Sequence, residues 1–413
     1  MQHRKHRVPG SEAIEACQIR QVSTQSYFQL QPKIINMKVP LIDLSGQHQS
    51  LRLNLLDAVA RVIDSQQFVL GSEVASLEQE IARYSNTSFA IGCGSGSDAL
   101  LLALMALDIK AGDEVITTPF TFFATGSAIA RVGARPQFVD IDPRTYNINP
   151  ALVEAAITER TRAILPVHMY GQCADMDALL DIASRHELAI VEDCAQAIGA
   201  TDRGRQAGSM GQLGCFSFYP TKNLGGAGDG GMVVTNDESL ATRVRKLRVH
   251  GGATEYQHDE VGINSRLDAM QAAILKVKLD YLDQWSDARR RKADLYDELL
   301  HETAHSRKFV LPFVKPESRH IFHQYVIRAP GYRDELIQHL SQHGVGNKIY
   351  YPVPLHLQQC FAYLNYKRGE FPEAERASLE TVALPCFPEL TEQQQHYVGD
   401  VLSRFVVAGK ATG

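Results

Sequence analysis

The sequence predicts an α/β protein: a three-layer sandwich built on a mostly parallel sheet, followed by a smaller C-terminal α+β lobe. Three observations lead to this prediction. From residue 37 to about residue 237, short apolar segments alternate with amphipathic ones. The short segments are unalternated runs of Val, Ile, Leu and Phe, which indicates strands buried on both faces. Beyond residue 237 the pattern changes to a long amphipathic helix and then to mixed strands and helices.

The individual elements follow from this alternation. Strands are expected at 88–93, 114–118, 136–141, 162–168, 188–194, 214–219 and 231–235. Helices are expected before the first strand at 47–66 and 73–85, and between later strands at 97–108, 121–132, 149–158 and 175–186. Helices that alternate with buried strands imply a parallel sheet covered on both sides. The last two strands follow one another without a helix, which suggests an antiparallel insertion.

The C-terminal part begins with a helix expected at 238–249. A single long helix is then expected from about 266 to 300, because its apolar residues recur at steps of three and four. We therefore divide the chain into an N-terminal extension at 1–36, expected to be disordered, a large α/β domain at 37–265, and a bridging helix with a small α+β domain at 266–413.

Composition excludes several classes of protein. The 413 residues include 42 Lys and Arg against 47 Asp and Glu, so the net charge of −5 gives no basic footprint for nucleic acid. The longest apolar run, 99–107, is about half as long as a membrane span. The 7 cysteines form no CxxC pair, which suits a reducing cytoplasm. No apolar signal segment occurs in residues 1–36. We expect a cytoplasmic protein with no nucleic-acid or membrane partner.

A run of small residues, "GCGSGSDA" at 92–99, follows a predicted strand and opens a predicted helix. Small residues let the backbone approach a ligand, and the free N–H groups of a helix start attract an anion. The run also matches a dinucleotide fingerprint from Gly94 through Gly96 to Ala99. A tight turn without a ligand is the third interpretation.

Two further motifs carry charged side chains at strand ends. Glu192 and Asp193 end a buried strand, where carboxylates face the ligand crevice of parallel sheets or cap the next helix. Lys222 follows another strand and precedes a loop that contains five glycines and is expected to be flexible. Burial would lower the pKa of such a lysine and leave a nucleophilic amine, whereas a solvated loop lysine is the alternative.

Together these motifs favour pyridoxal 5'-phosphate (PLP) as the cofactor. PLP needs a lysine for its Schiff base, a carboxylate facing its pyridinium nitrogen and an anion site for its phosphate. An aromatic face against the ring would help to orient it, and Phe120, Phe122 and Phe123 follow a strand end. An NAD-dependent dehydrogenase would leave Lys222 and Asp193 without a role.

Several segments resemble, in their sequence and in their order along the chain, one family, the DegT/StrS-like nucleotide-sugar aminotransferases. These enzymes are a branch of the PLP fold-type I, or aspartate aminotransferase, superfamily. The matching segments, spread over about 39–401, include "CGSGSDAL", "VEDCAQAIGA", "FSFYPTKNLGGAGDGG" and "GINSRLDAMQAAIL". The resemblance implies a homodimer that transfers an amino group, normally from glutamate, to the keto group of a nucleotide-linked sugar by a ping-pong route.

The resemblance also implies roles for single residues. Lys222 would form the Schiff base and shuttle a proton, Asp193 would pair with the pyridinium nitrogen, Gln196 would bond the phenolic oxygen, and Phe122 would stack on the ring. The phosphate would be held by residues of both subunits: Gly96, Ser97 and Ser217 of one, and Asn264 of the other.

The same resemblance bears on the substrate. Lys222 argues against a branch that replaces this lysine by histidine, and "NLGGAGDGG" after it resembles enzymes acting at sugar carbon three rather than carbon four. Arg266 and Tyr350 lie in segments that reach the sugar nucleotide in relatives. The alternatives are a sugar 4-aminotransferase and a non-catalytic PLP-fold regulatory protein. The segments "RTYNI", "YGQCADMD" and "GINSRLD" resemble enzymes that make 2-acetamido-3-amino sugars, which favours surface polysaccharide or amino-sugar biosynthesis.

Two histidine-containing motifs are expected to play no part in the chemistry. His168, in "PVHMYG", is expected to be a core histidine with satisfied hydrogen bonds. The sequence HExxH at 301–305 has the spacing of a zinc motif but no obvious third ligand, so no metal is expected.

Overall fold

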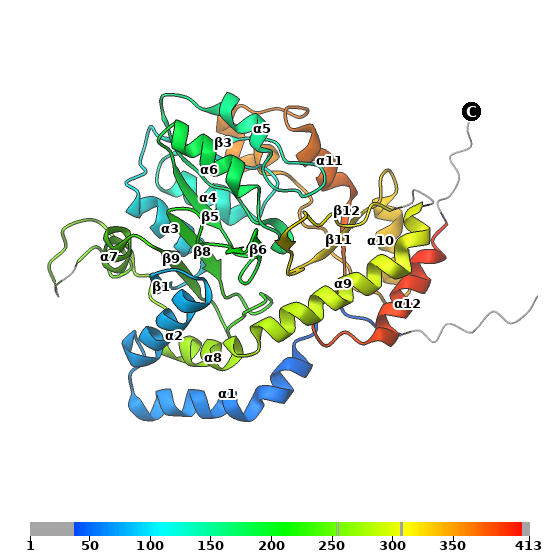
Figure 1. Ribbon diagram of the computed structural model, residues 1–413, viewed down its shortest axis with the longest axis horizontal. Helices are drawn as coiled ribbons and strands as arrows, with labels where there is room; N and C mark the ends of the chain where they lie inside the picture. Colours follow the sequence, from blue (N-terminus) through cyan, green and yellow to red (C-terminus); the bar gives the residue numbers. More distant parts are fainter. Residues whose placement is uncertain (1–36, 253, 255, 306–308, 407–413) are drawn as a thin grey trace, which may run out of the picture. The chain divides into compact units, whose positions relative to one another are not determined.

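The computed structural model describes residues 37–252, 254, 256–305 and 309–406, so the predicted N-terminal extension lies outside the described residues. Its centre is a seven-stranded sheet of order β1-β9-β8-β5-β4-β2-β3 (Figure 1). The strands are β1 (Phe89–Cys93), β2 (Glu114–Thr117), β3 (Arg135–Phe138), β4 (Thr161–Ile164), β5 (Ala189–Asp193), β8 (Leu213–Ser217) and β9 (Gly231–Thr235). Strand β9 runs antiparallel to both of its neighbours, β1 and β8, and the other neighbouring strands in this sheet pair in parallel. The predicted mostly parallel sheet with a late antiparallel strand is confirmed.

Helices cover both faces of this sheet. One face packs against α3 (Gly96–Ala106), α4 (Phe123–Arg131) and α7 (Glu238–Leu247). The opposite face packs against α2 (Gly71–Tyr84), α6 (Met176–Arg185) and α8 (Ala269–Leu279), and α1 (Ser45–Ser65) lies against α8. Alternate residues of a strand feed these two cores, because successive side chains point to opposite faces. The three-layer prediction is therefore confirmed.

The single helix expected from about 266 to 300 is wrong in one respect. Two helices occupy this stretch, α8 (Ala269–Leu279) and α9 (Leu282–His305), separated at Asp280 and Tyr281. The two halves have different neighbours: α8 packs against α1 and α2, whereas α9 packs against α12 (Glu392–Ser403). Each half buries an apolar stripe, so the three- and four-residue spacing continues across the break and hides it in the sequence.

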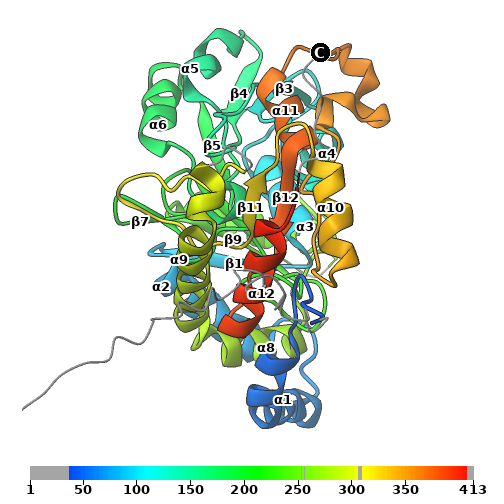
Figure 2. The same ribbon diagram turned by 90° about the vertical axis from the view of Figure 1, so that its right-hand side faces the viewer.

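A second, smaller sheet lies in the C-terminal part of the chain (Figure 2). Its strands β11 (Tyr325–Arg328) and β12 (Thr381–Leu384) pair antiparallel, and α10 (Arg333–Gln342), α11 (Pro372–Glu380) and α12 flank them. A separate apolar core joins β11, β12, α10 and α12 to α9, whereas α11 contributes to another core. A backbone bridge between Lys348 and Ala383 places the segment that contains Tyr350 beside β12. From there the chain reaches the large sheet, where the Leu355 N–H donates to the Pro119 carbonyl at 2.7 Å.

The smaller elements complete the described chain without altering its layers. They are α5 (Pro150–Val153), the 3-10 turns η1 (Glu154–Ala156), η2 (Met169–Gly171), η3 (Leu355–Leu357) and η4 (Gln359–Leu364), and a small sheet of β6 (Thr201–Asp202), β7 (Arg205–Gln206) and β10 (Ser318–Arg319).

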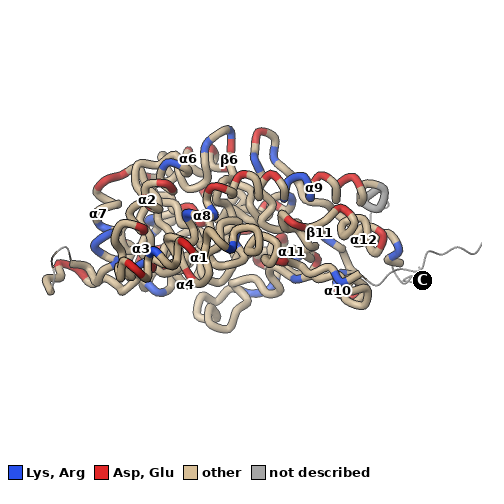
Figure 3. Tube along the Cα trace, turned by 90° about the horizontal axis from the view of Figure 1, so that it is seen from below, with Lys and Arg blue, Asp and Glu red and all other residues tan. Residues whose placement is uncertain are grey.

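The surface of α9 carries both signs of charge. Acidic and basic residues are interspersed along it (Figure 3). Asp287 on this helix pairs with Arg319 at 3.0 Å. In the basic run at 289–292, Arg290 and Arg291 are exposed on this mixed-charge face, whereas Arg289 is buried. Among the described residues, no helix combines the length and apolarity that crossing a bilayer would need.

Candidate functional site

A cavity of about 500 Å³ opens where the parallel strands end. Residues that directly follow β1, β2, β4, β5 and β8 line one side of it, which is the ligand-binding edge of α/β sheets. Residues of the C-terminal part line the other side. The predicted site residues that line this cavity are Gly96, Ser97, Phe122, Asp193, Gln196, Ser217, Lys222 and Tyr350. Strand ends that are far apart in the sequence therefore meet at one place.

One end of the cavity is the first turn of α3. Ser95 caps this helix: its Oγ accepts from the Asp98 N–H at 3.1 Å, and its carbonyl accepts from the Ala99 N–H at 2.9 Å. The first amides of a helix have no acceptor within the helix. Of these amides the cap takes that of Asp98, so the N–H groups of Gly96 and Ser97 are left to serve a ligand. This arrangement is suited to an anion such as a phosphate group.

Backbone crowding explains why glycines stand here. A Cβ atom on Gly96 would lie 2.5 Å from the Cβ of Ser217, so glycine lets the end of β8 approach the helix start. A Cβ on Gly231 would collide with the carbonyl oxygen of Ser95. Ser217 is thereby held against the free amides, and its hydroxyl can serve the same anion.

Asp193 supplies a buried carboxylate to the cavity. Its side chain accepts from the Thr125 hydroxyl at 2.8 Å and from the Ala195 N–H at 3.1 Å, and the residue is 5% exposed. Burial raises the pKa of this carboxyl, while these two hydrogen bonds and the nearby Lys222 act in the opposite direction. Glu192 precedes it on the strand and points to the other face, so only Asp193 faces the cavity.

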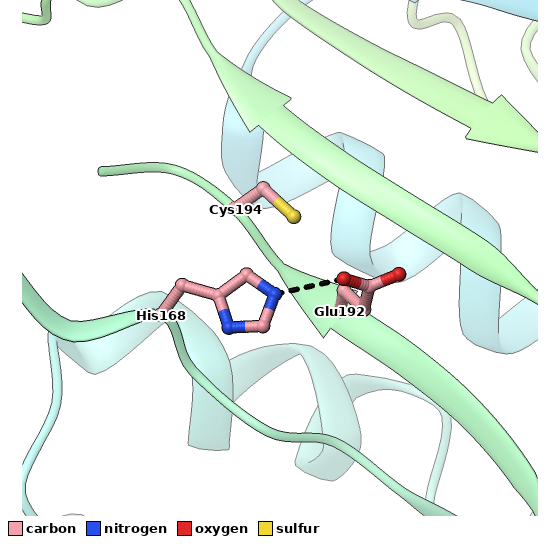
Figure 4. Close-up of side chains that lie close together, drawn as sticks. All are labelled: His168, Glu192 and Cys194. Atoms are coloured by element: carbon pink, nitrogen blue, oxygen red, sulfur yellow. Dashed lines mark hydrogen bonds and ion pairs between the residues drawn. The ribbon is translucent and has the colours of Figure 1, made fainter. Parts of the chain in front are cut away.

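His168, Glu192 and Cys194 lie close together (Figure 4). His168 is fully buried, and its Nδ1 accepts from the Ala174 N–H at 3.1 Å. Its Nε2 therefore carries the proton and donates to Glu192 at 2.8 Å. The Glu192 carboxylate also accepts from three backbone N–H groups, those of Gly208, Met210 and Gly211. The side chains of this cluster have the chemistry of metal ligands. However, hydrogen bonds already engage both ring nitrogens of His168 and both carboxylate oxygens of Glu192, as expected of a core histidine.

Lys222 reaches the cavity from the turn that follows β8. Its N–H donates to the Tyr219 carbonyl at 2.8 Å, and its side chain is half-buried in the cavity wall. Burial lowers the pKa of the Lys222 amine from 10.5 to about 8, with the charge of Asp193 opposing this shift. The amine is thus available in its neutral, nucleophilic form near physiological pH.

The glycines after Lys222 differ from the flexible loop that the sequence suggested. Gly225 and Gly226 are buried, and a Cβ on Gly225 would collide with the carbonyl oxygen of Pro220. The Gly226 N–H donates to the Phe218 carbonyl at 2.8 Å. These glycines allow the chain to fold closely against the turn that carries the lysine, which holds Lys222 in place.

The lowered pKa leads to a test on the protein without ligands. Labelling of Lys222 by an amine-reactive ester is expected to rise with pH, with a midpoint near pH 8, and then to level off. Exposed lysines as a class, with pKa values of about 10.4, should continue to gain reactivity beyond that point. Peptide mass spectrometry over a pH series measures both in one sample. A midpoint near pH 10 for Lys222 would contradict the effect of burial.

The structure separates the three candidate phenylalanines. Phe120 is fully buried, and Phe123 packs on Phe361 with ring centroids 5.7 Å apart. Phe122 lines the cavity and is 57% exposed, with its ring 6.0 Å from that of Tyr351. Phe122 is therefore the one of the three that can lie against a flat ligand.

Gln196 is held in place by hydrogen bonds on both sides of its amide. Its Nε2 donates to the Tyr351 hydroxyl at 3.0 Å, and its Oε1 accepts from the Tyr170 N–H at 2.7 Å. The Tyr170 hydroxyl in turn donates to the Tyr350 carbonyl. This network ties the floor of the cavity to the Tyr350 segment.

The lining residues that were not predicted from the sequence include His323, Lys348 and Tyr351. The motifs "HIFHQYVIRA" and "IYYPVPLH" contain or adjoin them, but no local pattern shows that these segments meet the strand ends. Among the described residues, two basic side chains line the cavity, those of Lys222 and Lys348.

Two predicted residues do not line the cavity of their own chain. Asn264 is exposed, and its backbone pairs with Val249. Arg266 is half-buried nearby. Ser265, between them, accepts from the Gly94 N–H at 2.9 Å, so the segment lies behind the turn that opens α3.

Comparisons with known proteins agree with this geometry. The model of the DegT/DnrJ/EryC1/StrS aminotransferase family matches residues 49–403. A "pleiotropic regulatory protein" of Geobacillus stearothermophilus is 53% identical, over 89% of this chain and 99% of the relative. A UDP-N-acetyl-3-dehydro-α-D-glucosamine 3-aminotransferase of Acidithiobacillus ferrooxidans is 45% identical, over 89% of this chain and 98% of the relative. The solved structure of S. venezuelae DesV in complex with a ketimine intermediate has a TM-score of 0.86 and 43% identity, covering 90% of this chain and 100% of that one.

Proposed function

The chain belongs to the DegT/DnrJ/EryC1/StrS aminotransferase family, and we propose that it transfers an amino group from glutamate to the keto group at carbon three of a nucleotide-linked sugar. The observation that carries the proposal is the meeting of Lys222, Asp193 and the free amides of α3 in one cavity. The relative from A. ferrooxidans, named for amination at carbon three, supports the position of the keto group. Amino-sugar or surface polysaccharide biosynthesis would use such a product.

The residues of the cavity fit PLP, the cofactor of this family. They include a lysine amine with a lowered pKa, a buried carboxylate and a helix start with free N–H groups. Gly96, Ser97 and Ser217 would hold the phosphate, and Asp193 would face the ring nitrogen. Gln196 would bond the phenolic oxygen, and Phe122 would lie against the ring. When bound, PLP supplies a carbonyl carbon for an amine to attack and a ring that takes up the electrons left on the substrate carbon.

Lys222 moves the proton in both halves of the reaction. Its neutral amine accepts a proton from the α-carbon of the amino donor and later returns a proton to carbon three of the sugar. Asp193, as a carboxylate, stabilises positive charge at the ring nitrogen. Both substrates are anionic, and Lys348 on the opposite wall provides a cation for a carboxylate or diphosphate.

A homodimer with shared sites is part of the proposal. Asn264 is exposed and lies outside the cavity of its own chain, which suits a residue that reaches the phosphate site of a partner subunit. Replacing Asn264 by alanine is expected to weaken cofactor retention roughly tenfold, the effect of losing one hydrogen bond to a charged group. Absorbance of the bound cofactor after dialysis measures retention. Asn54→Ala, which removes an exposed asparagine on α1, is the matched control, and equal retention by both variants would refute the shared site.

A half-reaction assay tests the function directly. The purified holoenzyme first reacts with glutamate, which leaves the amino group on the enzyme. This amino form is then mixed with 3-keto or 4-keto sugars linked to UDP or dTDP. Amination of a 3-keto sugar is the expected result. Amination at carbon four only would identify a sugar 4-aminotransferase instead.

A regulatory role is the second candidate, because the 53% identical relative carries the name of a regulatory protein. A regulator without catalysis would need neither a reactive amine at Lys222 nor a carboxylate at Asp193. Conversion of no sugar in the panel, with normal cofactor binding, would favour this role. We also propose a cytoplasmic location, since the described cysteines are free thiols and fit a reducing compartment.

A further inference from the structure

His323 lies in the cavity wall beside the turn that carries the reactive lysine. It is 9% exposed, and its Nδ1 is 3.0 Å from the Oδ1 of Asn223, the residue directly after Lys222. The Nδ2 of Asn223 donates to the Ile321 carbonyl at 3.4 Å. That bond points the amide oxygen, not the amide nitrogen, at the histidine ring. A hydrogen bond to Asn223 thus links His323 to the turn that carries Lys222.

These contacts fix the tautomer of His323. An amide oxygen only accepts hydrogen bonds, so Nδ1 must carry the ring proton. In the neutral ring, Nε2 then has a free lone pair. Nε2 has no hydrogen-bond partner in the part of the chain that the structure describes, and it is not among the polar atoms enclosed by protein. Because the ring lines the cavity, this lone pair is available to a ligand.

The ring stays neutral at physiological pH. Burial lowers the pKa of His323 well below its usual value of 6.5, and the positive charges of Lys222 and Arg289 lower it further. Arg289, on α9, also donates to the His323 carbonyl at 3.3 Å. His323 therefore offers the cavity a hydrogen-bond acceptor and neither a donor nor a cation.

We propose that Nε2 of His323 accepts a hydrogen bond from a hydroxyl or amide N–H group of the nucleotide-linked sugar, and so selects and orients the amino acceptor. This inference rests on the proposed function. The chemistry of the two substrates distinguishes them. Both carboxylates of glutamate are ionised near pH 7 and only accept hydrogen bonds, and its amino nitrogen is the reacting atom. The sugar brings hydroxyl groups, and in an acetamido form an N–H group, so only the sugar offers a free donor to this ring.

The two half-reactions of the holoenzyme separate the effects. Replacing His323 by leucine is expected to lower kcat/KM for the nucleotide sugar about five- to tenfold, the usual effect of one hydrogen bond. The half-reaction with glutamate should stay within about twofold. His323→Gln should recover most of the loss, because a glutamine amide oxygen can accept near the position of Nε2. Equilibrium titration of each variant with the nucleotide sugar should show the same order of affinities.

A substrate analogue identifies the group that is bound. With an analogue that lacks the hydrogen-bonding hydroxyl, His323→Leu should not lower kcat/KM any further. With the complete sugar, the same replacement should lower it. Equal losses in both half-reactions, with no recovery by His323→Gln, would show that His323 only shapes the Lys222 turn and would overturn the inference. Unchanged sugar turnover by His323→Leu would also overturn it. If the parent protein aminates no nucleotide sugar, the proposed function fails, and this inference fails with it.

Discussion

Replacing Lys222 by alanine is expected to abolish amino transfer, with kcat lower by about 10⁴-fold, the upper range for loss of a positioned acid–base group. The expected effect is large because Lys222 would both hold the cofactor through its amine and move the proton in each half-reaction. Burial gives this amine a pKa of about 8, so it is reactive where an ordinary lysine would be protonated. Rapid-mixing measurements of each half-reaction show whether both are lost.

The visible spectrum provides an independent measurement for this variant. The band of lysine-bound cofactor should be absent from Lys222→Ala, and borohydride should abolish it in the parent protein. Lys110→Ala, which removes an exposed lysine in a surface turn, is the matched control and should leave both rate and spectrum unchanged. Transfer at the parent rate by Lys222→Ala would refute the proposed mechanism.

The second large effect is expected for Asp193→Asn, with kcat lower by roughly 10³-fold, because a neutral amide cannot stabilise positive charge at the ring nitrogen. Asparagine has nearly the same shape, and its amide oxygen can still accept from the Thr125 hydroxyl. The thermal unfolding midpoint should therefore change little. Steady-state kinetics with glutamate and a nucleotide sugar measures the loss, and full activity of this variant would refute the role of Asp193.

Glu192→Gln is the matched control for this prediction. It makes the same chemical change one residue earlier, on the opposite face of the strand. Glu192 accepts hydrogen bonds from His168 and from three backbone N–H groups. Weakening these charge-assisted bonds should destabilise the fold by about 2–3 kcal/mol while leaving kcat of the folded protein near its parent value.

Local patterns predicted the side of the site that belongs to the parallel sheet. Asp193 could be found because it ends a strand, and Gly96 and Ser97 because they open a helix, whereas Ser217 came from the family resemblance. Local patterns alone could not choose between Glu192 and Asp193, since the choice depends on which face of the strand meets the cavity. They also could not separate Phe122 from Phe120 and Phe123, for which packing decides. The family resemblance pointed to Asp193 and Phe122.

Elements that depend on tertiary contacts were not predictable in the same way. The break between α8 and α9 leaves no mark, because both helices continue the apolar spacing against different neighbours. His323 and Tyr351 join the site only because the C-terminal part lies against the strand ends. A single histidine in an apolar segment has the pattern of a core residue. The glycines after Lys222 suggested a flexible loop. Glycine is also the residue that close packing of the backbone requires, and the sequence does not distinguish the two cases.

The two sides of the cavity differ in what evolution can change. The floor around α3 and β8 is built largely from backbone amides and from glycines that leave no space for a side chain, so almost any replacement there alters the anion site. The opposite wall, with His323, Lys348 and Tyr350, consists of side chains on a different part of the chain. Replacements in that wall can be accumulated one at a time without disturbing the floor. One scaffold can therefore diversify its acceptor while it inherits the amino-transfer chemistry unchanged.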